Sequence, residues 1–191
     1  MNKLLIIVSL ISSIILSQES TQDNKKTNAL MLSINHTFQI PEGDMADRFG
    51  NNSDISITVF YKTKDNFILS LEGGVLFGPT VKENNPFQAI DGNDGNLISQ
   101  NGEIPTIRLF ERGAHIDVSF GKYFKFPNRK NESGIMLSFG TGYMYHKIFI
   151  ETLITQLPQL NETLLKGYDR LCGGILTKQF IGYLHLSNTN N

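Results

Sequence analysis

The chain has 191 residues, a formal net charge of -1, one cysteine, no tryptophan and 17 glycines. This length corresponds to one domain. The near-neutral charge, without a long basic run, gives no electrostatic reason to expect nucleic acid as a partner. A single cysteine, Cys172, excludes an internal disulfide, so an exported form must obtain its stability from packing and strand pairing.

The first 17 residues have the pattern of a secretory signal peptide. Lys3 precedes an apolar run from Leu4 to Leu16, and a polar segment follows Ser17. A membrane-spanning helix needs about 20 apolar residues, so the run fits a cleaved signal peptide better than the alternative, an uncleaved anchor. We therefore predict a signal peptide over 1–17, a polar segment over 18–28 and one domain over 29–191.

Three strands are predicted in the first half of this domain. In residues 29–40, Leu30 and Leu32 share one face and Ser33 the other, which is the period-2 alternation of a β-strand. Residues 54–62 and 67–77 repeat the alternation on either side of the short turn TKDN.

Three more strands are predicted in the second half, over residues 113–124, 134–146 and 171–186. The stretch GIMLSFGTGYMYH over 134–146 has the clearest pattern, because its large residues have one face to themselves and its small residues the other. In the last strand, Thr177 and Gln179 interrupt the apolar face.

The predicted connections alternate between short and long. The links TKDN and FPNRKNES are short, whereas PEGDMADRFGNN, residues 78–112 and the segment after His146 are long. In the last of these, Pro158 limits any helix. Antiparallel strands joined in this way form an up-and-down meander with tight turns at one end and large loops at the other.

Two architectures bury such a sheet: a soluble barrel with its apolar face inside, or an outer-membrane barrel with that face towards lipid. Strand lengths of ten or more residues, a Gly/Ser/Thr-rich opposite face, aromatic residues near strand ends and the loop asymmetry favour the membrane. We predict an all-β, antiparallel up-and-down transmembrane β-barrel, with about six strands visible and eight expected for closure. A soluble exported ligand-binding barrel stays the alternative.

Several sequence stretches resemble a family of small bacterial outer-membrane β-barrel proteins, of OmpA-like or OmpX-like size. These stretches are EGDMADRFGNN, LFGPTVKEN, ERGAHIDVSFGKYF, and KGYDRLCGG leading into QFIGY. The resemblance implies export and an outer-membrane location, and it brings no catalytic motif. Family members continue by one more hairpin, so the resemblance also implies that a final hairpin is absent from this sequence.

Polar residues on the small face are the candidates for the barrel interior: Glu72, Asp117 and Lys178. They could line an ion or proton path, or they could pair with one another inside a filled interior. For a barrel of about eight strands we favour the filled interior.

Two groups of loop residues are candidates for interaction: Asp44, Asp47 and Arg48 in the first long loop, and Tyr168, Asp169 and Arg170 before the last strand. The first group could be a weak cation site, but a solvated loop with an Asp47–Arg48 contact is favoured. The second could serve surface recognition or form an ion pair that anchors the loop.

The sequence predicts no catalytic, cofactor-binding or metal-binding residue. DGNDGN over 91–96 does not match the EF-hand template, and His115 and His146 lie in no hydrolase motif. We therefore expect a structural or interaction role in the cell envelope, with outer-membrane lipid and, through the long loops, other envelope proteins as partners. The alternatives are a narrow pore or transport component and, further away, an outer-membrane enzyme.

Overall fold

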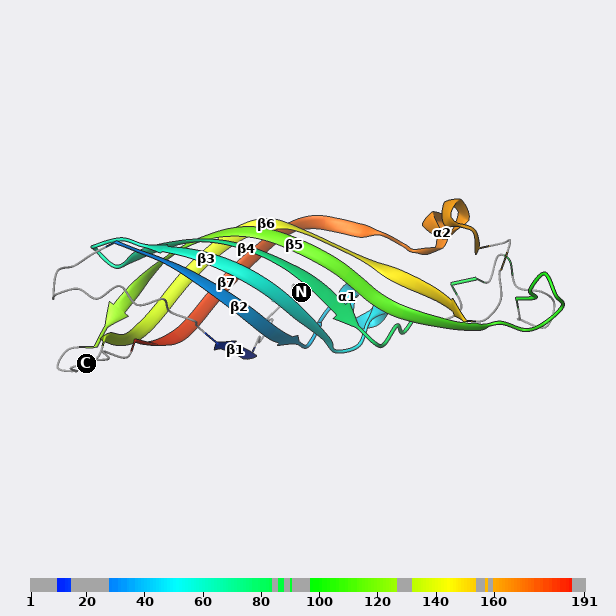
Figure 1. Cartoon of the computed structure of the whole chain (residues 1–191), viewed down its shortest axis with the longest axis horizontal. Coiled ribbons are helices and arrows are strands. Elements are labelled where there is room, and N and C mark those ends of the chain that lie inside the picture. The colour runs from blue at the N-terminus through cyan, green and yellow to red at the C-terminus, as the bar shows by residue number, and fades with distance from the viewer. Residues whose placement is uncertain are drawn as a thin grey trace.

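The computed structural model describes residues 10–14, 28–83, 86–87, 90, 97–126, 132–153, 157 and 160–186. It is an all-β structure with two short helices (Figure 1). The strands are β1 (Leu10–Ile14), β2 (Ala29–Gln39), β3 (Asn52–Lys62), β4 (Phe67–Gly78), β5 (Thr106–Lys125), β6 (Glu132–Leu153) and β7 (Cys172–Leu186). The helices are α1 (Asp44–Arg48) and α2 (Glu162–Tyr168). Of the helices in the described part of the chain, none has the length and hydropathy to cross a membrane.

Each strand pairs antiparallel with the next one along the chain, in the order β1 to β7. The predicted antiparallel up-and-down sheet is therefore confirmed, and the six long strands β2 to β7 correspond to the six predicted ones. The short strand β1 lies within the segment predicted as a signal peptide and pairs with the free side of β2. The signal peptide itself stays a prediction.

The described strands do not close into a barrel. The strand pairings end at β1 on one side and at β7 on the other, and none joins these two edges within the described ranges. The predicted closure of a barrel by eight strands is therefore not observed, because the described sheet contains only the six long strands and β1. The observed fold is a curled open sheet.

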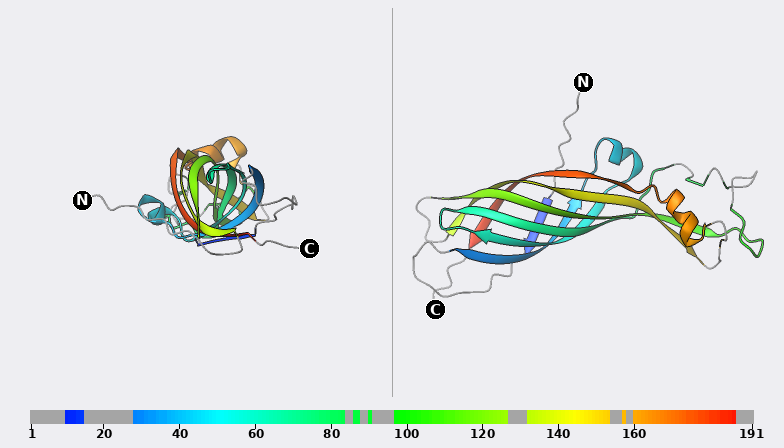
Figure 2. Two further views of the ribbon diagram at one scale, coloured as in Figure 1. Left: turned by 90° about the vertical axis from the view of Figure 1, so that its left-hand side faces the viewer. Right: turned by 90° about the horizontal axis from the view of Figure 1, so that it is seen from above.

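The curl brings strands together that are not neighbours in the sheet. Figure 2 shows the sheet end-on as a deep trough. Three spacings of about 4.8 Å separate β4 from β7, so in a flat sheet side chains on these two strands would start roughly 14 Å apart. The Nζ of Lys178 on β7 nevertheless lies 2.7 Å from Oε2 of Glu72 on β4. These side chains meet across the inside of the trough, which we call the concave face.

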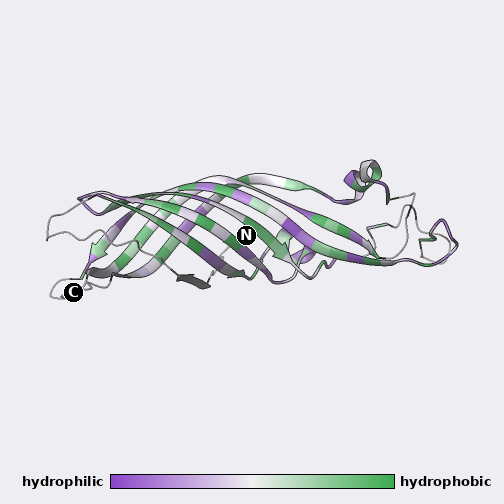
Figure 3. Ribbon diagram, viewed as in Figure 1, coloured by the Kyte–Doolittle hydropathy of each residue, from purple (hydrophilic) through white to green (hydrophobic). Residues whose placement is uncertain are grey.

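The two faces of the sheet have the reverse of the usual distribution of polarity. Large apolar side chains are exposed on the outer face, and polar side chains are buried on the concave face. Figure 3 shows hydrophobic and hydrophilic residues alternating along the long strands. Exposed apolar residues include Leu30, Leu32, Ile34, Ile57, Val59, Leu69, Leu71, Ile116, Val118, Phe120, Leu137, Phe139, Ile175 and Ile181. Buried polar residues on the concave face include Ser33, Asn35, Asn52, Asp54, Ser56, Thr58, Glu111, Asp117 and Ser119.

Strands β5 and β6 extend well beyond their predicted ends at residues 113 and 146, and in the extension the polarity of the two faces exchanges. Ile148 and Ile150 are buried there, whereas Arg108 and Arg112 on the opposite face are exposed. The buried residues join an apolar cluster with residues of the long loops: Phe49, Phe87, Leu97, Leu157 and Leu160. This cluster, which we call the loop core, is a conventional hydrophobic core.

A second, smaller apolar cluster lies at the short-turn end of the sheet. It consists of Ile68, Tyr123 and Met136, with Phe60 and Phe180 packed against it. The polar part of the concave face therefore lies between two apolar clusters, one near the long loops and one near the tight turns.

Candidate functional site

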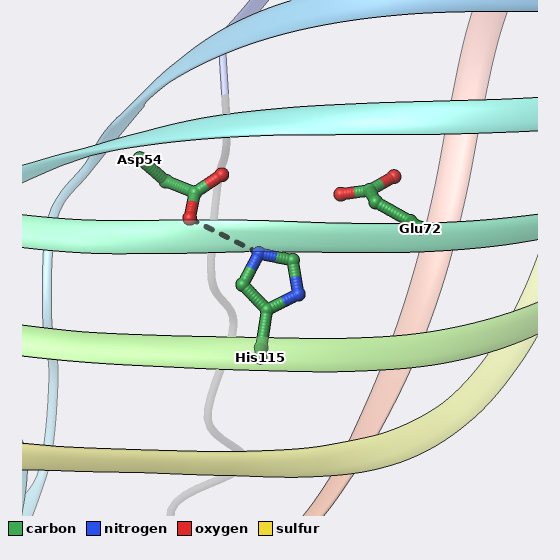
Figure 4. Close-up of side chains that lie close together, drawn as sticks. All are labelled: Asp54, Glu72 and His115. Atoms are coloured by element: carbon green, nitrogen blue, oxygen red, sulfur yellow. Dashed lines mark hydrogen bonds and ion pairs between the residues drawn. The ribbon is translucent and has the colours of Figure 1, made fainter.

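The middle of the concave face carries a cluster of ionisable side chains from four strands. We call it the charged cluster; its members are Asp54 on β3, Glu72 on β4, His115 and Asp117 on β5, and Lys178 on β7. Figure 4 shows three of them: the imidazole ring of His115 and the carboxylates of Asp54 and Glu72. The strand alternation places every member on the small face of its strand.

His115 lies between two carboxylates. Its Nε2 is 3.0 Å from Oδ2 of Asp54, and its Nδ1 is 3.2 Å from Oδ2 of Asp117. The His115 side chain is 8% exposed and those of its two partners are less exposed still, so water competes little for these contacts. The hydroxyl of Ser119 donates to the other oxygen of Asp117 at 3.3 Å. The ring is therefore held in one orientation from both sides.

Lys178 connects the third carboxylate of the cluster, Glu72, to Asp117. Its Nζ lies 2.7 Å from Oε2 of Glu72 and 3.7 Å from Oδ1 of Asp117. Burying an ammonium and a carboxylate is costly unless the two are paired and their other polar atoms are satisfied. Here Glu72 also accepts a hydrogen bond from the hydroxyl of Thr58 at 2.9 Å.

The network continues from Thr58 to strand β2. The amide of Asn35 donates to the Thr58 hydroxyl at 2.7 Å, and Ser33 donates to the Asn35 carbonyl oxygen at 2.6 Å. Five of the six long strands therefore contribute to one connected set of polar contacts. Such a set fixes the curl of the sheet, because each contact requires its strands to stay in register.

Glycines on the concave face make room for the charged cluster. Gly74 is the register partner of both Ser56 and His115, and a Cβ at this position would lie 2.9 Å from Oδ2 of Asp54 and closer still to Nε2 of His115. Gly142 faces Asp117 in the β5–β6 register, and a Cβ there would lie 2.6 Å from the Cβ of Asp117. A larger residue at either position would displace the imidazole or the carboxylate.

The three interior residues predicted from the sequence are brought together: Lys178 contacts both Glu72 and Asp117. Sequence reasoning missed Asp54 as a member, and it considered His115 only as part of a hydrolase. The alternation of side chains could have identified Asp54, since it lies two residues before Ser56 and therefore on the same face of β3 as Ser56 and Thr58.

Two of the predicted loop residues, Arg48 and Arg170, meet at Glu83, which the sequence analysis did not single out. Nε of Arg48 lies 2.8 Å from Oε1 of Glu83, and Nε of Arg170 lies 3.1 Å from its Oε2. Arg48 also donates to the backbone oxygen of Arg170 at 3.2 Å. The expected Asp47–Arg48 contact is wrong for the described residues: consecutive residues of a helix do not face each other, and Arg48 pairs with Glu83 instead.

The other loop candidates have separate surroundings. Tyr168 packs against the loop core, with its ring centroid 5.8 Å from that of Phe87. Asp169 pairs with Lys147 at 3.3 Å, whereas Asp44 lies in the first turn of α1. The calcium-like stretch over 91–96 lies outside the described residues.

Glu111 is a buried carboxylate at the boundary between the charged cluster and the loop core. Its Oε2 accepts from the amide of Asn52 at 2.9 Å, whereas its Oε1 has no hydrogen-bond partner. Burial raises the pKa of Glu111 above its ordinary value, and the hydrogen bond from Asn52 opposes this only in part. At this position the protonated, neutral form of the Glu111 side chain is therefore favoured over the charged form.

We predict that Glu111 makes the protein less stable as the pH rises. With its folded-state pKa above the unfolded value, the folded protein retains a proton that the unfolded chain has released. Its stabilising contribution is complete below the ordinary carboxyl pKa and is lost as the pH rises through the raised pKa. Urea unfolding between about pH 4 and about pH 8 should show this loss, and Glu111→Gln should remove it.

The control is Glu103→Gln, since Glu103 is exposed. This variant should keep the pH dependence of the unmodified protein. If Glu111→Gln instead has the same pH dependence as the unmodified protein, the assignment to Glu111 is wrong.

Comparison with known proteins gives no relative: no protein-family model, no curated protein and no solved structure matches the chain. The resemblance to small outer-membrane barrels stays a prediction made from the sequence motifs.

Proposed function

We propose that this protein is a small outer-membrane β-barrel protein of the bacterial envelope, with a structural or interaction role and a filled interior. The observation that carries the proposal is the reversed polarity of the sheet. Ile116, Val118 and Phe120 are 58, 49 and 58% exposed on β5, whereas Asp117 between them is 1% exposed. Each buried methylene contributes about 0.8 kcal/mol, so a sheet with this outer face gains most when hydrocarbon covers it.

The reversed polarity does not favour a soluble ligand-binding barrel. In that alternative, the apolar row would line the cavity and the polar row would meet water. Here the concave face holds Asp54, Glu111 and Asp117, each at most 2% exposed. A contiguous apolar outer face of this extent is also far more than monomeric soluble proteins leave exposed.

The exchange of polarity along β5 and β6 supports a boundary between lipid and water near Arg112 and Lys147. These two residues are register partners; beyond them Arg108 is exposed on the outer face, and Ile148 and Ile150 are buried on the concave face together with Glu111. On the lipid side of this boundary, residues 114–124 carry the apolar row. This length is close to the 9–11 residues that a tilted strand needs to cross a bilayer.

The contents of the concave face favour a filled interior over a pore. Ion pairs link β3, β4, β5 and β7 across the trough, and an apolar cluster lies at either end of them. Small membrane barrels are commonly filled by side chains in this way. A role in conduction therefore receives no specific support.

The loops offer the surface for an interaction role. The loop core lies beyond the proposed lipid boundary, and the ion pairs of Glu83 with Arg48 and Arg170 tie the first, second and last long connections together. A preorganised loop surface outside the membrane suits binding of another envelope component, because little conformational entropy is lost on binding.

In a bilayer the edges of the sheet must be paired, since an unsatisfied backbone group in hydrocarbon costs several kcal/mol. Because β1 lies within the predicted signal peptide, its cleavage would leave β2 and β7 as the edges. The proposal therefore includes pairing of these two edges by contacts other than those between the described strands. Heat-modifiability detects such closure, because a closed barrel resists detergent until it is boiled.

The test combines cell fractionation with a heat-modifiability gel. The full chain, expressed in a Gram-negative host, should be recovered in the outer-membrane fraction, should resist extraction by carbonate and should migrate differently before and after boiling. Recovery in the aqueous fraction, without any change of migration, would contradict the proposal.

A further inference from the structure

We propose that Asp54, Glu72 and His115 bind one divalent transition-metal ion, with Zn²⁺ as the reference ion. One ligand atom from each of these residues lies within 4.8 Å of the others. Figure 4 shows both carboxylates turned towards the imidazole from neighbouring strands. This inference concerns the concave face and is independent of the role of the loops.

The distances suit a small ion after a modest adjustment. Zinc lies about 2.0–2.2 Å from nitrogen and oxygen ligands, so a tetrahedral site holds its ligand atoms roughly 3.4 Å apart. Nε2 of His115 and Oδ2 of Asp54 are already 3.0 Å apart. They need to separate only slightly, while the Glu72 carboxylate moves inwards. One imidazole and two carboxylates form a ligand set that first-row transition metals accept.

Asp117 holds His115 in the orientation that a metal ligand requires. Its Oδ2 lies 3.2 Å from Nδ1, on the side of the ring away from the proposed ion. Nε2 faces an acceptor oxygen of Asp54, so the ion takes the place of the Nε2 proton, which is released on binding. A contact between Nδ1 and a carboxylate is typical of metal-binding histidines. Asp117 is thus a positioning residue and does not itself bind the ion.

The hydroxyl of Ser56 supplies an independent indication of a missing ligand. Ser56 is 1% exposed, and its Oγ has no hydrogen-bond partner. A Cβ at Gly74 would lie 2.8 Å from the Cβ of Ser56 and 2.9 Å from Oδ2 of Asp54, and closer to Nε2 of His115. The serine, the carboxylate and the imidazole therefore lie close together over Gly74, where the absence of a side chain leaves room for them. A water bound to the ion there could donate to the Ser56 hydroxyl.

The charge of the cluster also suits a divalent cation. With a neutral imidazole, the three carboxylates and Lys178 leave a formal charge of -2. Lys178 competes with the metal ion for the Glu72 carboxylate, because its Nζ lies 2.7 Å from Oε2 of Glu72. Its side chain is 27% exposed and also reaches Asp117 at 3.7 Å, so it has room to release Glu72. Removing this ammonium should therefore strengthen metal binding.

The experiment titrates the purified, metal-free full chain with ZnCl₂ in a calorimeter and records the visible absorption of the Co²⁺ form. We expect one ion per chain and a tetrahedral Co²⁺ spectrum. Asp117→Asn should weaken Zn²⁺ binding about 10–100-fold, and His115→Ala should abolish it. The matched control is His36→Ala, since His36 is exposed on the outer face and should not affect binding.

Lys178→Met separates a metal site from a purely structural ion-pair network. For a metal site, this variant binds Zn²⁺ more tightly than the unmodified protein. If the cluster serves only as a network, the variant loses stability and gains no Zn²⁺ binding, which would overturn the proposal. If His115→Ala fails to fold, Glu72→Gln takes its place: unchanged Zn²⁺ binding in that variant would also overturn it.

Discussion

Replacing Val118 with arginine is expected to lower the free energy of unfolding by about 2–4 kcal/mol in lipid vesicles. Val118 lies midway along the proposed membrane span of β5 and is 49% exposed on the outer face. A guanidinium at this depth has no water and no counter-charge beside it, so the folded state carries the cost. Urea titration of the protein folded into vesicles measures the effect.

The matched control is Thr106→Arg, on the same strand and the same face. Thr106 is exposed and lies beyond the proposed lipid boundary at Arg112, so arginine there should change the free energy of unfolding by less than about 0.5 kcal/mol. Equal, small effects at both positions would mean that water covers the whole outer face of β5.

Replacing Asp117 with alanine is expected to destabilise the metal-free protein by about 3–5 kcal/mol. Asp117 is 1% exposed and is the one carboxylate that contacts both His115 and Lys178. Its removal leaves these two groups buried with fewer partners, which costs more than the original pair contributed. Chemical unfolding in the presence of a chelator gives the difference.

Two further variants test whether the loss of stability in Asp117→Ala comes from the polar network. Ser138→Ala also truncates a side chain of a spanning strand, but no network contact involves Ser138, so its effect should be below about 1 kcal/mol. The double variant with His115→Ala should cost less than the sum of the two single variants, because both remove the same contact. Additive effects would show that Asp117 and His115 act separately.

The strands were predictable because alternation of side chains depends only on the local sequence. Even the least regular predicted strand is present as β7, since β6 provides a partner along its whole length. The ends of β5 and β6 were not predictable in this way. Between Glu111 and Gly113 the apolar residues change sides while the strand continues, so a search for one apolar face ends too early.

The charged cluster was predictable only in part. Alternation places Glu72, Asp117 and Lys178 on one face, and the structure brings them together. The contact between Asp54 and His115 depends on the curl of the sheet and on the registers of β3 with β4 and of β4 with β5. Neither quantity follows from the spacing of residues within a single strand. The pairing of Arg48 with Glu83 likewise depends on how two separate loops meet.

Nitroxide labels on β5 and β6 test most directly where lipid contacts the outer face. Single cysteines at Leu137, Phe139, Arg108 and Glu151, on a Cys172→Ser background, place two labels within the proposed span and two beyond it. In reconstituted vesicles, dissolved oxygen, which concentrates in lipid, should relax the labels at Leu137 and Phe139. A nickel complex, which stays in water, should relax the labels at Arg108 and Glu151. Strong relaxation by the nickel complex at all four positions would contradict a lipid-covered face.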